Sequence, residues 1–423
     1  MTTPVERRGL DVAAVRDHFP ALERRIENRP VAYLDGAGGA QVPRECIDAM
    51  AGYLRTRNAN THGAFATSLE TDALVAEAHA AAADFLGAHD PAEIVFGPNM
   101  TTLTFAVSRA IGRELGTDDE IVVTRLDHDA NVAPWLAVAQ DRGAVIRWVD
   151  IRPDDCTLDL AQLERSVGPR TRVVAIGLAS NAVGTINDVG RAVDIAHAGG
   201  AVTYVDAVHA APHLPIDVAT MRTDYLACSP YKFFGPHLGI LYGRGEHLER
   251  LRAYRVRPAG DELPGKFETG TQNHEALAGL LGTFEYLAAL GRAYGGASHD
   301  ADRRTAFRAA LGAIREYERR LTIPLLEGLA SVPGLRIYGI TDPARGDERV
   351  STAAFTLGRH SPRAIAEHLG QRGINAWDGD YYAYELIRRL GLADSGGMVR
   401  IGLLHYNTAA EIERLVDALH ELA

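Results

Sequence analysis

Short runs of β-forming residues alternate with longer helical patterns from about residue 90 to residue 245. The intervening segments, such as 102–115, 132–140 and 189–198, are rich in Ala, Leu and Arg. Strands that alternate with helices in this way form a largely parallel sheet whose crossover helices cover its faces. The pattern therefore predicts a wound α/β domain with a seven-stranded sheet. The strand-like runs are residues 93–96, 120–124, 145–149, 171–176, 201–205, 225–228 and 239–242.

The pattern changes after about residue 270. Long helices are predicted at residues 275–291 and 301–329, and a strand, helix, strand and helix follow between residues 350 and 422. This order favours a second, smaller α+β domain. We expect three units along the chain: an N-terminal segment that packs with the small domain, a large α/β domain and a small α+β domain. Their expected bounds are 1–30, 31–270 and 271–423.

Charge and composition exclude several classes of partner and site. The formal net charge is -11 at pH 7 and no dense stripe of Lys and Arg is present. A nucleic-acid partner is therefore disfavoured, because phosphate contacts require a basic face. The sequence also has no run of about 18 apolar residues that would span a membrane. Cys46, Cys156 and Cys228 are too scattered for a disulfide framework or a zinc site. We expect a cytoplasmic protein with reduced thiols and no bound metal.

Lysine is rare in this sequence. Of the 44 Lys and Arg residues, only Lys232 and Lys266 are lysine. Arginine can serve wherever a cation is enough, but imine formation requires an amine that can lose its proton, which a guanidinium does not do. Each lysine is therefore a candidate for covalent chemistry, although Lys266 is equally well explained as an ordinary surface residue.

Asp206 and Lys232 follow two successive predicted strands. Asp206 ends the run 201–205, and Lys232 comes shortly after the run 225–228. Ligands of open α/β sheets bind outside the carboxyl ends of the strands, so both residues are expected at the binding edge. Pyridoxal 5'-phosphate (PLP) needs such a pair: the lysine holds the cofactor as a Schiff base, and the carboxylate keeps its pyridine nitrogen protonated. The spacing alone leaves a structural Asp–Lys ion pair open.

The residues around Lys232 resemble a known motif. The segment 229–240, Ser-Pro-Tyr-Lys-Phe-Phe-Gly-Pro-His-Leu-Gly-Ile, is similar to the lysine motif of class V aminotransferases, in the cysteine desulfurase group. The resemblance covers most of the chain through ordered motifs at 33–35, 127–131, 180–187 and 267–271, and at Arg400. It implies the PLP fold type I, with a large sheet domain and a smaller C-terminal domain. It also implies PLP as the cofactor and an amino acid as the substrate.

The resemblance assigns cofactor contacts near the pyridine ring. His128 matches the histidine that stacks on the ring, and Asn181 and His209 match positions that contact the ring oxygen. His209 stands where desulfurases usually have glutamine. A lone histidine is more often a core or surface residue than a ligand, but His128 and His209 both follow predicted strands at the active edge.

The resemblance also assigns a phosphate site. Met100 and Thr101 open a helix after the run 93–96, where backbone amides can bind an anion, although a plain threonine N-cap is the alternative. Ser229 and Tyr231 flank the lysine at positions that bind phosphate in the family. Thr271 matches a segment that reaches the phosphate of the neighbouring subunit. It implies a homodimer with composite sites, although Gly-Thr at 270–271 is also typical of a simple turn.

Two further matches concern the substrate. Arg400 ends the strand-like run 398–404 and matches the arginine that holds the substrate α-carboxylate in a bidentate pair. His62 lies in a stretch similar to a desulfurase active-site segment, where an arginine is expected. Substrate recognition through His62 and neutral drift on a loop explain this change about equally well.

The sequence departs from desulfurases in the loop that carries their catalytic cysteine. The matching region, residues 375–382, reads Asn-Ala-Trp-Asp-Gly-Asp-Tyr-Tyr and contains no cysteine. Persulfide transfer by a loop cysteine is therefore not expected. The aromatic side chains of this region, beside Asp378 and Asp380, favour a rim for a larger or cationic amino acid, or simply pack the loop. They belong to Trp377, Tyr381, Tyr382 and Tyr384.

Three hypotheses for the function remain. The first is a lyase in which Lys232 takes the Cα proton of the substrate, Asp206 sustains the electron sink, and a substituent such as sulfur leaves. The second is transamination or epimerisation on the same site, which begins with the same proton transfer. The third is a PLP-binding protein without turnover, which we consider the least favoured because no DNA-binding extension is visible.

Overall fold

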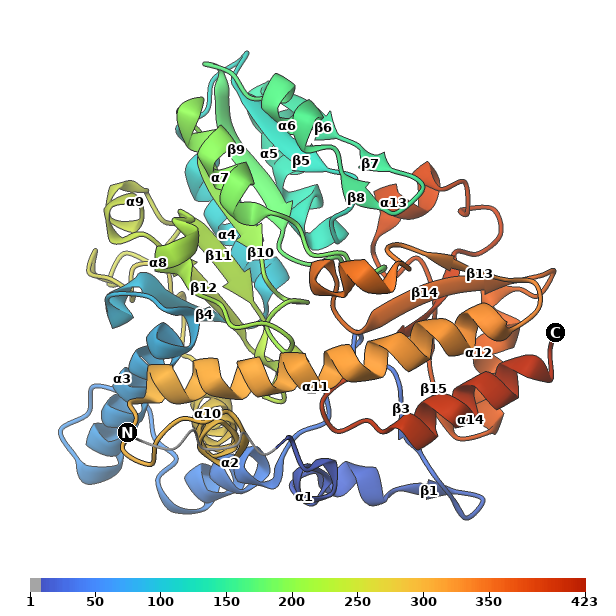
Figure 1. Ribbon diagram of the computed structural model, residues 1–423. Coiled ribbons are helices and arrows are strands. Elements are labelled where there is room, and N and C mark those ends of the chain that lie inside the picture. Colours follow the sequence, from blue (N-terminus) through green and yellow to red (C-terminus); the bar gives the residue numbers. More distant parts are fainter. Residues whose placement is uncertain (1–8) are drawn as a thin grey trace, which may run out of the picture.

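The computed structural model describes residues 9–423 and contains the expected large sheet (Figure 1). Its strands lie in the order β4-β12-β11-β10-β9-β5-β6. The prediction of a wound α/β fold with a seven-stranded sheet is confirmed. The strand bounds are β4 Ile94–Gly97, β5 Glu120–Thr124, β6 Val145–Val149, β9 Thr171–Gly177, β10 Val202–Asp206, β11 Tyr225–Cys228 and β12 Gly239–Gly243.

Strand β12 runs antiparallel to both of its neighbours, β11 and β4, whereas the other neighbouring pairs are parallel. The link between β11 and β12, residues 229–238, contains only a short 3-10 turn, η4 (Pro230–Lys232). Parallel strands need a crossover connection of roughly a dozen residues or more, usually a helix. The shorter link instead reverses the chain. It also holds Lys232 just past the carboxyl end of β11.

Side chains of the central strands alternate between the two faces of the sheet, as the pleat requires. Val205 and Leu226 belong to the core on one face, and Tyr204 and Tyr225 belong to the core on the other. The first face is covered by α6 (Leu160–Ser166) and α7 (Val189–Ala198), and the second by α4 (Met100–Gly112) and α5 (Ala133–Arg142). The strands are thus buried on both sides, as parallel sheets usually are.

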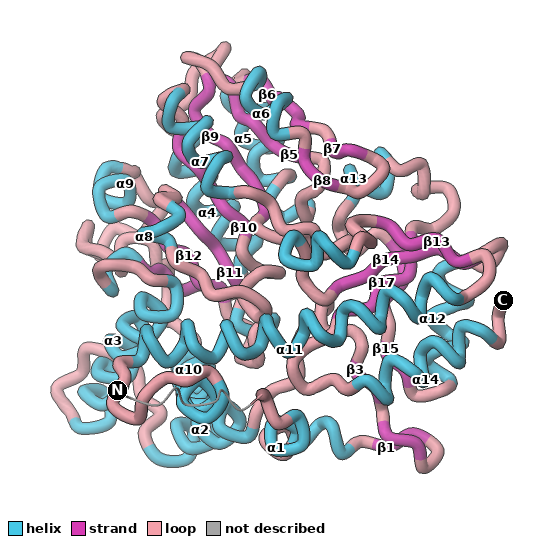
Figure 2. Tube along the Cα trace, in the orientation of Figure 1, coloured by secondary structure: helices cyan, strands magenta, loops and turns pink. Residues whose placement is uncertain are grey.

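A layer of long helices lies beside the β4 edge of the sheet. Helices α2 (Arg44–Thr56) and α3 (Ala66–Leu86) pack against α10 (His274–Tyr294). Helix α11 (Arg303–Ser331) contacts α3 and α10 and continues to the second sheet, so it spans the lower part of the molecule in Figures 1 and 2. This long helix connects the two sheet-containing parts of the chain.

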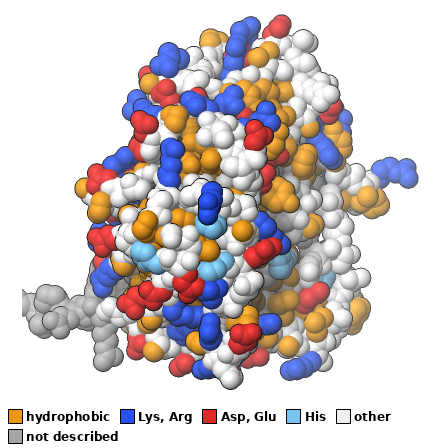
Figure 3. All heavy atoms as spheres, turned by 90° about the vertical axis from the view of Figure 1, so that its right-hand side faces the viewer, with side chains coloured by type: hydrophobic (Ala, Val, Ile, Leu, Met, Phe, Trp, Pro, Cys, Tyr) orange, Lys and Arg blue, Asp and Glu red, His pale blue; other side chains and the backbone are white. Residues whose placement is uncertain are grey.

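The second sheet has four antiparallel strands in the order β13-β14-β17-β16. They are β13 (Leu335–Tyr338), β14 (Thr352–Leu357), β16 (Trp377–Gly379) and β17 (Met398–Gly402). Helices α11, α12 (Pro362–Gln371) and α14 (Ala409–His420) bury apolar residues against the sheet. The side of the molecule with these C-terminal elements shows basic, acidic and histidine side chains among scattered apolar ones (Figure 3).

The N-terminal segment contacts the C-terminal part of the chain. Strand β3 (Ala32–Tyr33) pairs in parallel with β15 (Ile374–Asn375), and Arg16 donates a 2.7 Å hydrogen bond to the carbonyl oxygen of Tyr406. Residues 1–8 of the expected N-terminal unit lie outside the described residues. The unit boundaries after residues 30 and 270 stay predictions. No helix among residues 9–423 is long and apolar enough to cross a membrane.

The remaining elements are short. The helices and 3-10 turns are α1 (Val12–Arg16), η1 (Pro20–Glu23), η2 (Pro91–Glu93), η3 (Asp129–Asn131), α8 (Val218–Met221), α9 (Gly245–Arg250), η5 (Pro343–Glu348) and α13 (Tyr384–Arg389). The strands are β1 (Arg25–Ile26), β2 (Arg29–Pro30), β7 (Ile151–Arg152) and β8 (Thr157–Leu158).

Candidate active site

A pocket lies where β5, β9, β10 and β11 end. Most of the site residues expected from the sequence line this one pocket, although they come from segments that are far apart in the chain. They are Met100, Thr101, His128, Asn181, Asp206, His209, Ser229, Tyr231 and Lys232. Asp127 and Asn99 also line it and had not been assigned a role from the sequence. The pocket thus lies at the carboxyl edge of the sheet, where ligands of open α/β sheets bind.

Lys232 is held by the glycine-rich turn that follows β3. Its Nζ donates hydrogen bonds to the carbonyl oxygens of Ala37, at 2.6 Å, and Gly38, at 3.0 Å. The amine makes no ion pair within 4.0 Å with a carboxylate of residues 9–423, so the structural Asp–Lys pair is not what the chain forms. Burial and the nearby Arg400 lower the pKa of Lys232 to about 7, so a large fraction of the amine is neutral at physiological pH.

The link between β11 and β12, residues 229–238, which we call the lysine link, is anchored in the apolar core. Phe233 and Phe234, directly after Lys232, are fully buried. Phe85 of α3 stacks on Phe233 with ring centroids 4.7 Å apart. On the other side of the lysine, the ring of Tyr231 stacks on His237 at 5.1 Å. These contacts hold the backbone around Lys232 in place, which a lysine with a defined task requires.

Two buried carboxylates occupy the floor of the pocket. Asp206 accepts a 2.8 Å hydrogen bond from the backbone N–H of Val208, and burial raises its pKa to about 6. Asp127 accepts from the backbone N–H of Gly177 at 2.6 Å and from the side-chain amide of Asn131 at 3.2 Å. Burial and the charge of Asp206 raise the pKa of Asp127 well above its usual value. Among residues 9–423, no cationic side chain lies within 4.0 Å of the Asp206 carboxylate.

His128 presents a neutral ring. Burial, together with the charges of Lys232 and Arg400, lowers its pKa to about 4. Its Nδ1 accepts a 3.0 Å hydrogen bond from the backbone N–H of Ala130, so the neutral ring carries its proton on Nε2. Tyr382 stacks on this ring with centroids 5.3 Å apart. His128 is thereby fixed in orientation and in tautomer.

His209 is also buried and neutral. Burial and the nearby His213, Arg400 and Lys232 lower its pKa well below the usual value. Its Nε2 lies 3.0 Å from Oγ1 of Thr352, at the start of β14. The second sheet therefore supports a side chain of the pocket directly, which the sequence did not indicate.

The amino end of α4 and Ser229 form a compact cradle. The side chain of Asn99 caps the helix by accepting from the backbone N–H of Thr102 at 2.8 Å, and Oγ of Ser229 accepts from the backbone N–H of Met100 at 3.1 Å. A Cβ atom at Gly239 would lie 2.4 Å from the carbonyl carbon of Asn99, so only glycine lets β12 approach this closely. Backbone N–H groups and a hydroxyl at a helix start suit a phosphate group.

Arg400 lies beside the pocket with unused donors. It is buried, its Nη1 donates to the carbonyl oxygen of Asn181 at 2.8 Å, and its guanidinium lies over the ring of Tyr381 at 4.4 Å. Its Nε has no hydrogen-bond partner among residues 9–423, and no carboxylate there lies within 4.0 Å. Burial lowers its pKa to about 10, so it stays charged. A buried arginine without a counter-ion is suited to bind a carboxylate from outside the chain.

Tyr381 and Tyr382 belong to the segment 375–382, which we expect to correspond to the desulfurase loop, and they contact residues of the pocket. The backbone N–H of Asp129 donates to the carbonyl oxygen of Tyr382 at 2.7 Å, and the Asn181 amide donates to that of Tyr381 at 2.9 Å. Tyr381 and Tyr382 have φ values of 55° and 58°, which residues other than glycine rarely adopt. Strain of this kind persists only where surrounding contacts hold it.

His62 and Thr271 do not line the pocket of their own chain. The His62 side chain is 90% exposed, and its backbone N–H donates to the Asp72 carboxylate at 3.1 Å. Thr271 is exposed in the turn before α10. The roles expected for both residues remain predictions, and that of Thr271 depends on a second copy of the chain.

All three cysteines are buried and lie in regular or turn structure outside the segment 375–382. Cys46 lies on α2 and Cys228 on β11, as the sequence predicted. Burial raises the pKa of each thiol, to about 11 for Cys156. A buried thiol with a raised pKa is a poor nucleophile at neutral pH.

The residues of the pocket fit PLP. Ser229 and the start of α4 would hold the phosphate, Asp206 would face the pyridine nitrogen, and Lys232 would bind the aldehyde carbon. The fit rests on a feature of the chain itself: among residues 9–423, the buried Nε of Arg400 and Oδ1 of Asn181 have no hydrogen-bond partner, and the Asp206 carboxylate has no cationic side chain within 4.0 Å. Each of these residues lies where a cofactor with an amino-acid substrate would supply one.

The chain is similar to cysteine desulfurases over its whole length. Residues 32–311 and 304–415 match the family described as aminotransferase class-V. A cysteine desulfurase of Dickeya dadantii is 32% identical over 437 residues, with 100% of this chain and 98% of that protein covered.

Solved structures agree with this similarity. The cysteine desulfurase CsdA from Escherichia coli has a TM-score of 0.82 at 28% identity, with 98% of both chains covered. The apo structure of a cysteine desulfurase from Thermococcus onnurineus has a TM-score of 0.83 at 26% identity, with 97% of both chains covered. The chain therefore belongs to the class-V aminotransferase family and is a PLP-dependent enzyme of the cysteine desulfurase-like type.

Proposed function

We propose that this enzyme is a lyase that cleaves a C–S bond of an amino acid without passing the sulfur to a cysteine of the loop 375–382. The observation that carries the proposal is the combination of a site equipped for amino-acid chemistry with three cysteines that are all buried. The similarity to cysteine desulfurases along the whole chain supports sulfur as the leaving atom. The buried thiols argue for its release into solution.

In this proposal Arg400 binds the substrate and Lys232 takes a proton from it. The free Nε of Arg400 and its remaining N–H groups bind the α-carboxylate, which places the Cα atom above the pocket. The Lys232 amine, with a pKa near 7, is the base for the Cα proton. PLP, when bound, supplies an electron sink for the charge that develops at Cα, and the Asp206 carboxylate favours that role by holding a proton on the pyridine nitrogen.

His128 and residues 381–382 close the site. The neutral His128 ring offers its Nε2 proton as a donor and does not repel the Lys232 ammonium. Tyr382 over His128 and Tyr381 over Arg400 exclude water from one side of these groups. The exposed Trp377 and Tyr384 add to a rim that would admit a larger amino acid than cysteine.

A homodimer completes the site in this proposal. Phe65 and Leu69 follow His62 at the start of α3 and are more than half exposed, as are Tyr254 and Val256. Exposed apolar side chains of this size favour burial in an interface. Thr271 of one subunit would then reach the phosphate cradle of the other. We also propose a cytoplasmic location, where the three thiols stay reduced.

The decisive experiment measures all products at once. The holoenzyme is incubated with a panel of sulfur-containing and other amino acids, and sulfide or thiol, pyruvate, other keto acids and racemised substrate are assayed together. The proposal expects sulfide or thiol release that persists in the triple variant Cys46→Ala, Cys156→Ala, Cys228→Ala. Loss of sulfide release in that variant would show that a cysteine carries the sulfur. Keto acid or racemised product without sulfur release would assign transamination or epimerisation instead.

Cofactor binding and assembly need separate controls. A visible absorption band that survives dialysis in the wild type and is lost in Lys232→Ala is expected. Sedimentation should give a dimer that Val256→Asp weakens. A monomeric wild type that retains full activity would refute the composite site.

A further inference from the structure

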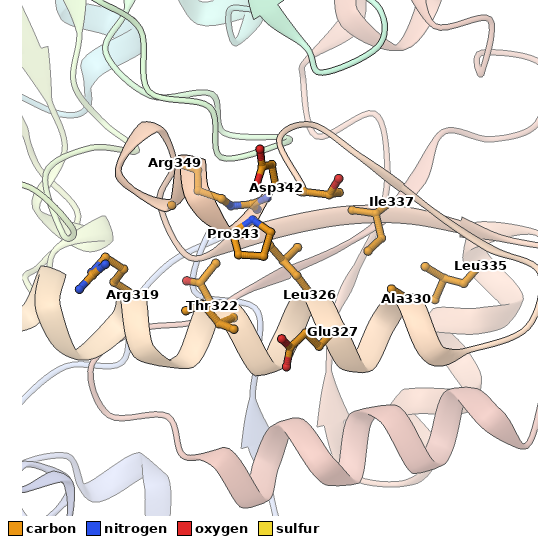
Figure 4. Close-up of a pocket in the computed structure, with 13 residues that line it drawn as sticks. Arg319, Thr322, Leu326, Glu327, Ala330, Leu335, Ile337, Asp342, Pro343 and Arg349 are labelled. Carbon is orange, nitrogen blue, oxygen red and sulfur yellow. The ribbon is translucent and has the colours of Figure 1, made fainter.

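A second pocket lies outside the active site, between α11, β13 and η5 (Figure 4). Its volume is about 460 Å³, within the range of small-molecule sites. Figure 4 shows Thr322, Leu326 and Ala330 along one side of α11, with Ile337 and Leu335 to one end and Arg349 across from the helix. We call this pocket the α11 groove. Its floor is apolar, and its rim carries charged side chains.

The α11 groove adjoins a smaller polar recess. The recess has a volume of about 10 Å³ and shares Thr322, Arg349 and two other residues with the groove. Its inner wall contains His213 and Glu318, which are 2% and 3% exposed and lie 2.6 Å apart between Nδ1 and Oε2. This volume is roughly the space that one water molecule or ammonium group needs.

Two polar atoms of the recess lack partners. Nε2 of His213 and Oε1 of Glu318 are buried and make no hydrogen bond to any of residues 9–423. Because Nδ1 of His213 lies against the Glu318 carboxylate, a neutral His213 has a free lone pair on Nε2. Both atoms can therefore accept a hydrogen bond. Buried acceptors without donors are rare in native structures and indicate a missing donor.

Arg349 lies at the junction of groove and recess and provides hydrogen-bond donors, whereas the unpartnered atoms of the recess are acceptors. It is 5% exposed, and among residues 9–423 no carboxylate lies within 4.0 Å of its guanidinium. The side chain donates to the carbonyl oxygens of Ile340, Val350 and Thr352. Since a guanidinium has five N–H donors, two are left for a ligand. A buried cation without a counter-ion favours an anionic group beside it.

We propose that the α11 groove and its recess bind a free amino acid with an apolar side chain, separately from the active site. The ammonium group would enter the recess and donate to Glu318 and His213, and the carboxylate would accept from the two free N–H groups of Arg349. The side chain would lie on Leu326, Ile337 and Ala330. In this arrangement the unpartnered acceptors of the recess receive donors, the free donors of Arg349 receive an acceptor, and the apolar floor of the groove is covered.

The test uses L-leucine as the probe and titration calorimetry on the holoenzyme. Ala330→Phe fills the groove from an exposed helix position, and Ala364→Phe places the same ring at an exposed position of α12 as the matched control. Arg400→Gln removes the carboxylate contact of the active site only. We expect saturable binding that falls at least about tenfold in Ala330→Phe and stays within about twofold in the other two variants.

Two analogues test the assigned charges. 4-Methylpentanoate lacks the ammonium group and 3-methylbutylamine lacks the carboxylate, so each should bind at least about tenfold more weakly than L-leucine. Absence of saturable binding by the wild type would overturn the proposal. It would also be overturned by Ala330→Phe binding as the wild type does, or by loss of binding in Arg400→Gln, which would place the ligand in the active site. Equal affinity for either analogue would refute the assigned contacts.

Discussion

The Nζ atom of Lys232 lies 2.6 Å from the carbonyl oxygen of Ala37, a residue 195 positions earlier in the chain. Gly38 offers a second carbonyl at 3.0 Å, and the ring of Trp377 occupies the space where a Cβ atom of Gly38 would be. Gly38 of the N-terminal turn is therefore packed between the Lys232 amine and Trp377 of β16. Burial of this amine is the main reason why the pKa of Lys232 falls to about 7.

We predict that the Lys232 amine of the cofactor-free protein titrates near pH 7. A lysine normally titrates near pH 10.5, and burial favours the neutral form, so reactivity should appear as the pH rises through about 7. Competitive acylation followed by mass spectrometry would measure this, and the chain has only two lysines to resolve. Lys232→Ala is the control for the assignment. A half-maximal labelling pH above about 9 would contradict the prediction.

Replacing Arg400 should weaken substrate binding. Arg400→Gln removes a charge-assisted, bidentate contact worth about 3 kcal/mol, so kcat/KM should fall roughly 100-fold, mainly through KM. Arg388→Gln is the matched control, because Arg388 is exposed and its side chain hydrogen-bonds, among residues 9–423, only to Tyr384. Steady-state kinetics with the substrate found in the product assay would check this. A fall in kcat with unchanged KM would count against carboxylate binding.

Removing the Tyr382 ring should raise the pKa of His128. Desolvation is the largest cause that holds this pKa near 4, and Tyr382→Ala opens one face of the histidine to water, so the value should move toward 6.5. An NMR titration of the histidine ring signals would measure it, with His128→Gln for assignment. Tyr384→Ala, an exposed tyrosine nearby, should leave the signal unchanged. No shift in Tyr382→Ala would mean that the stack does not shield His128.

Two glycine substitutions should have opposite effects. In Gly239→Ala the new Cβ would lie 2.4 Å from the backbone of Asn99, so we expect a loss of about 1–3 kcal/mol of stability and faster loss of cofactor. Gly312, within α11, has open space within 4 Å of the point where a methyl group would lie, so Gly312→Ala should gain roughly 0.5–1 kcal/mol. Urea unfolding and dialysis of the holoenzyme would measure both. Equal stability of the two variants would refute the steric argument.

The positions of the strands were predictable because strand and helix periods differ. All seven runs of the large sheet match strands of the structure to within one residue at each end, and Asp206, the last residue of β10, and Lys232, after β11, both line the pocket. The reversed direction of β12 was not predicted. It results from the short link that carries Lys232, whose length rules out a crossover helix.

Other parts of the site left no local signal. Asp127 reads as an ordinary residue of the motif 127–131, and its proximity to Asp206 arises only because β5, β9 and β10 end side by side. The contact between His209 and Thr352 joins positions 143 apart, and no periodicity reports such a pair. Burial of these groups is equally invisible in the sequence.

The sequence by itself determined the sheet, the edge at which chemistry occurs and the lysine that carries it, because these depend on short-range periodicity and on residue chemistry. Only the tertiary structure decided that Ala37 and Arg400 lie near the Lys232 amine, that Tyr382 stacks on His128, and that burial lowers the pKa of Lys232 to about 7. The physical reason is that packing sets both proximity and desolvation, and packing depends on contacts between segments that are distant in the chain.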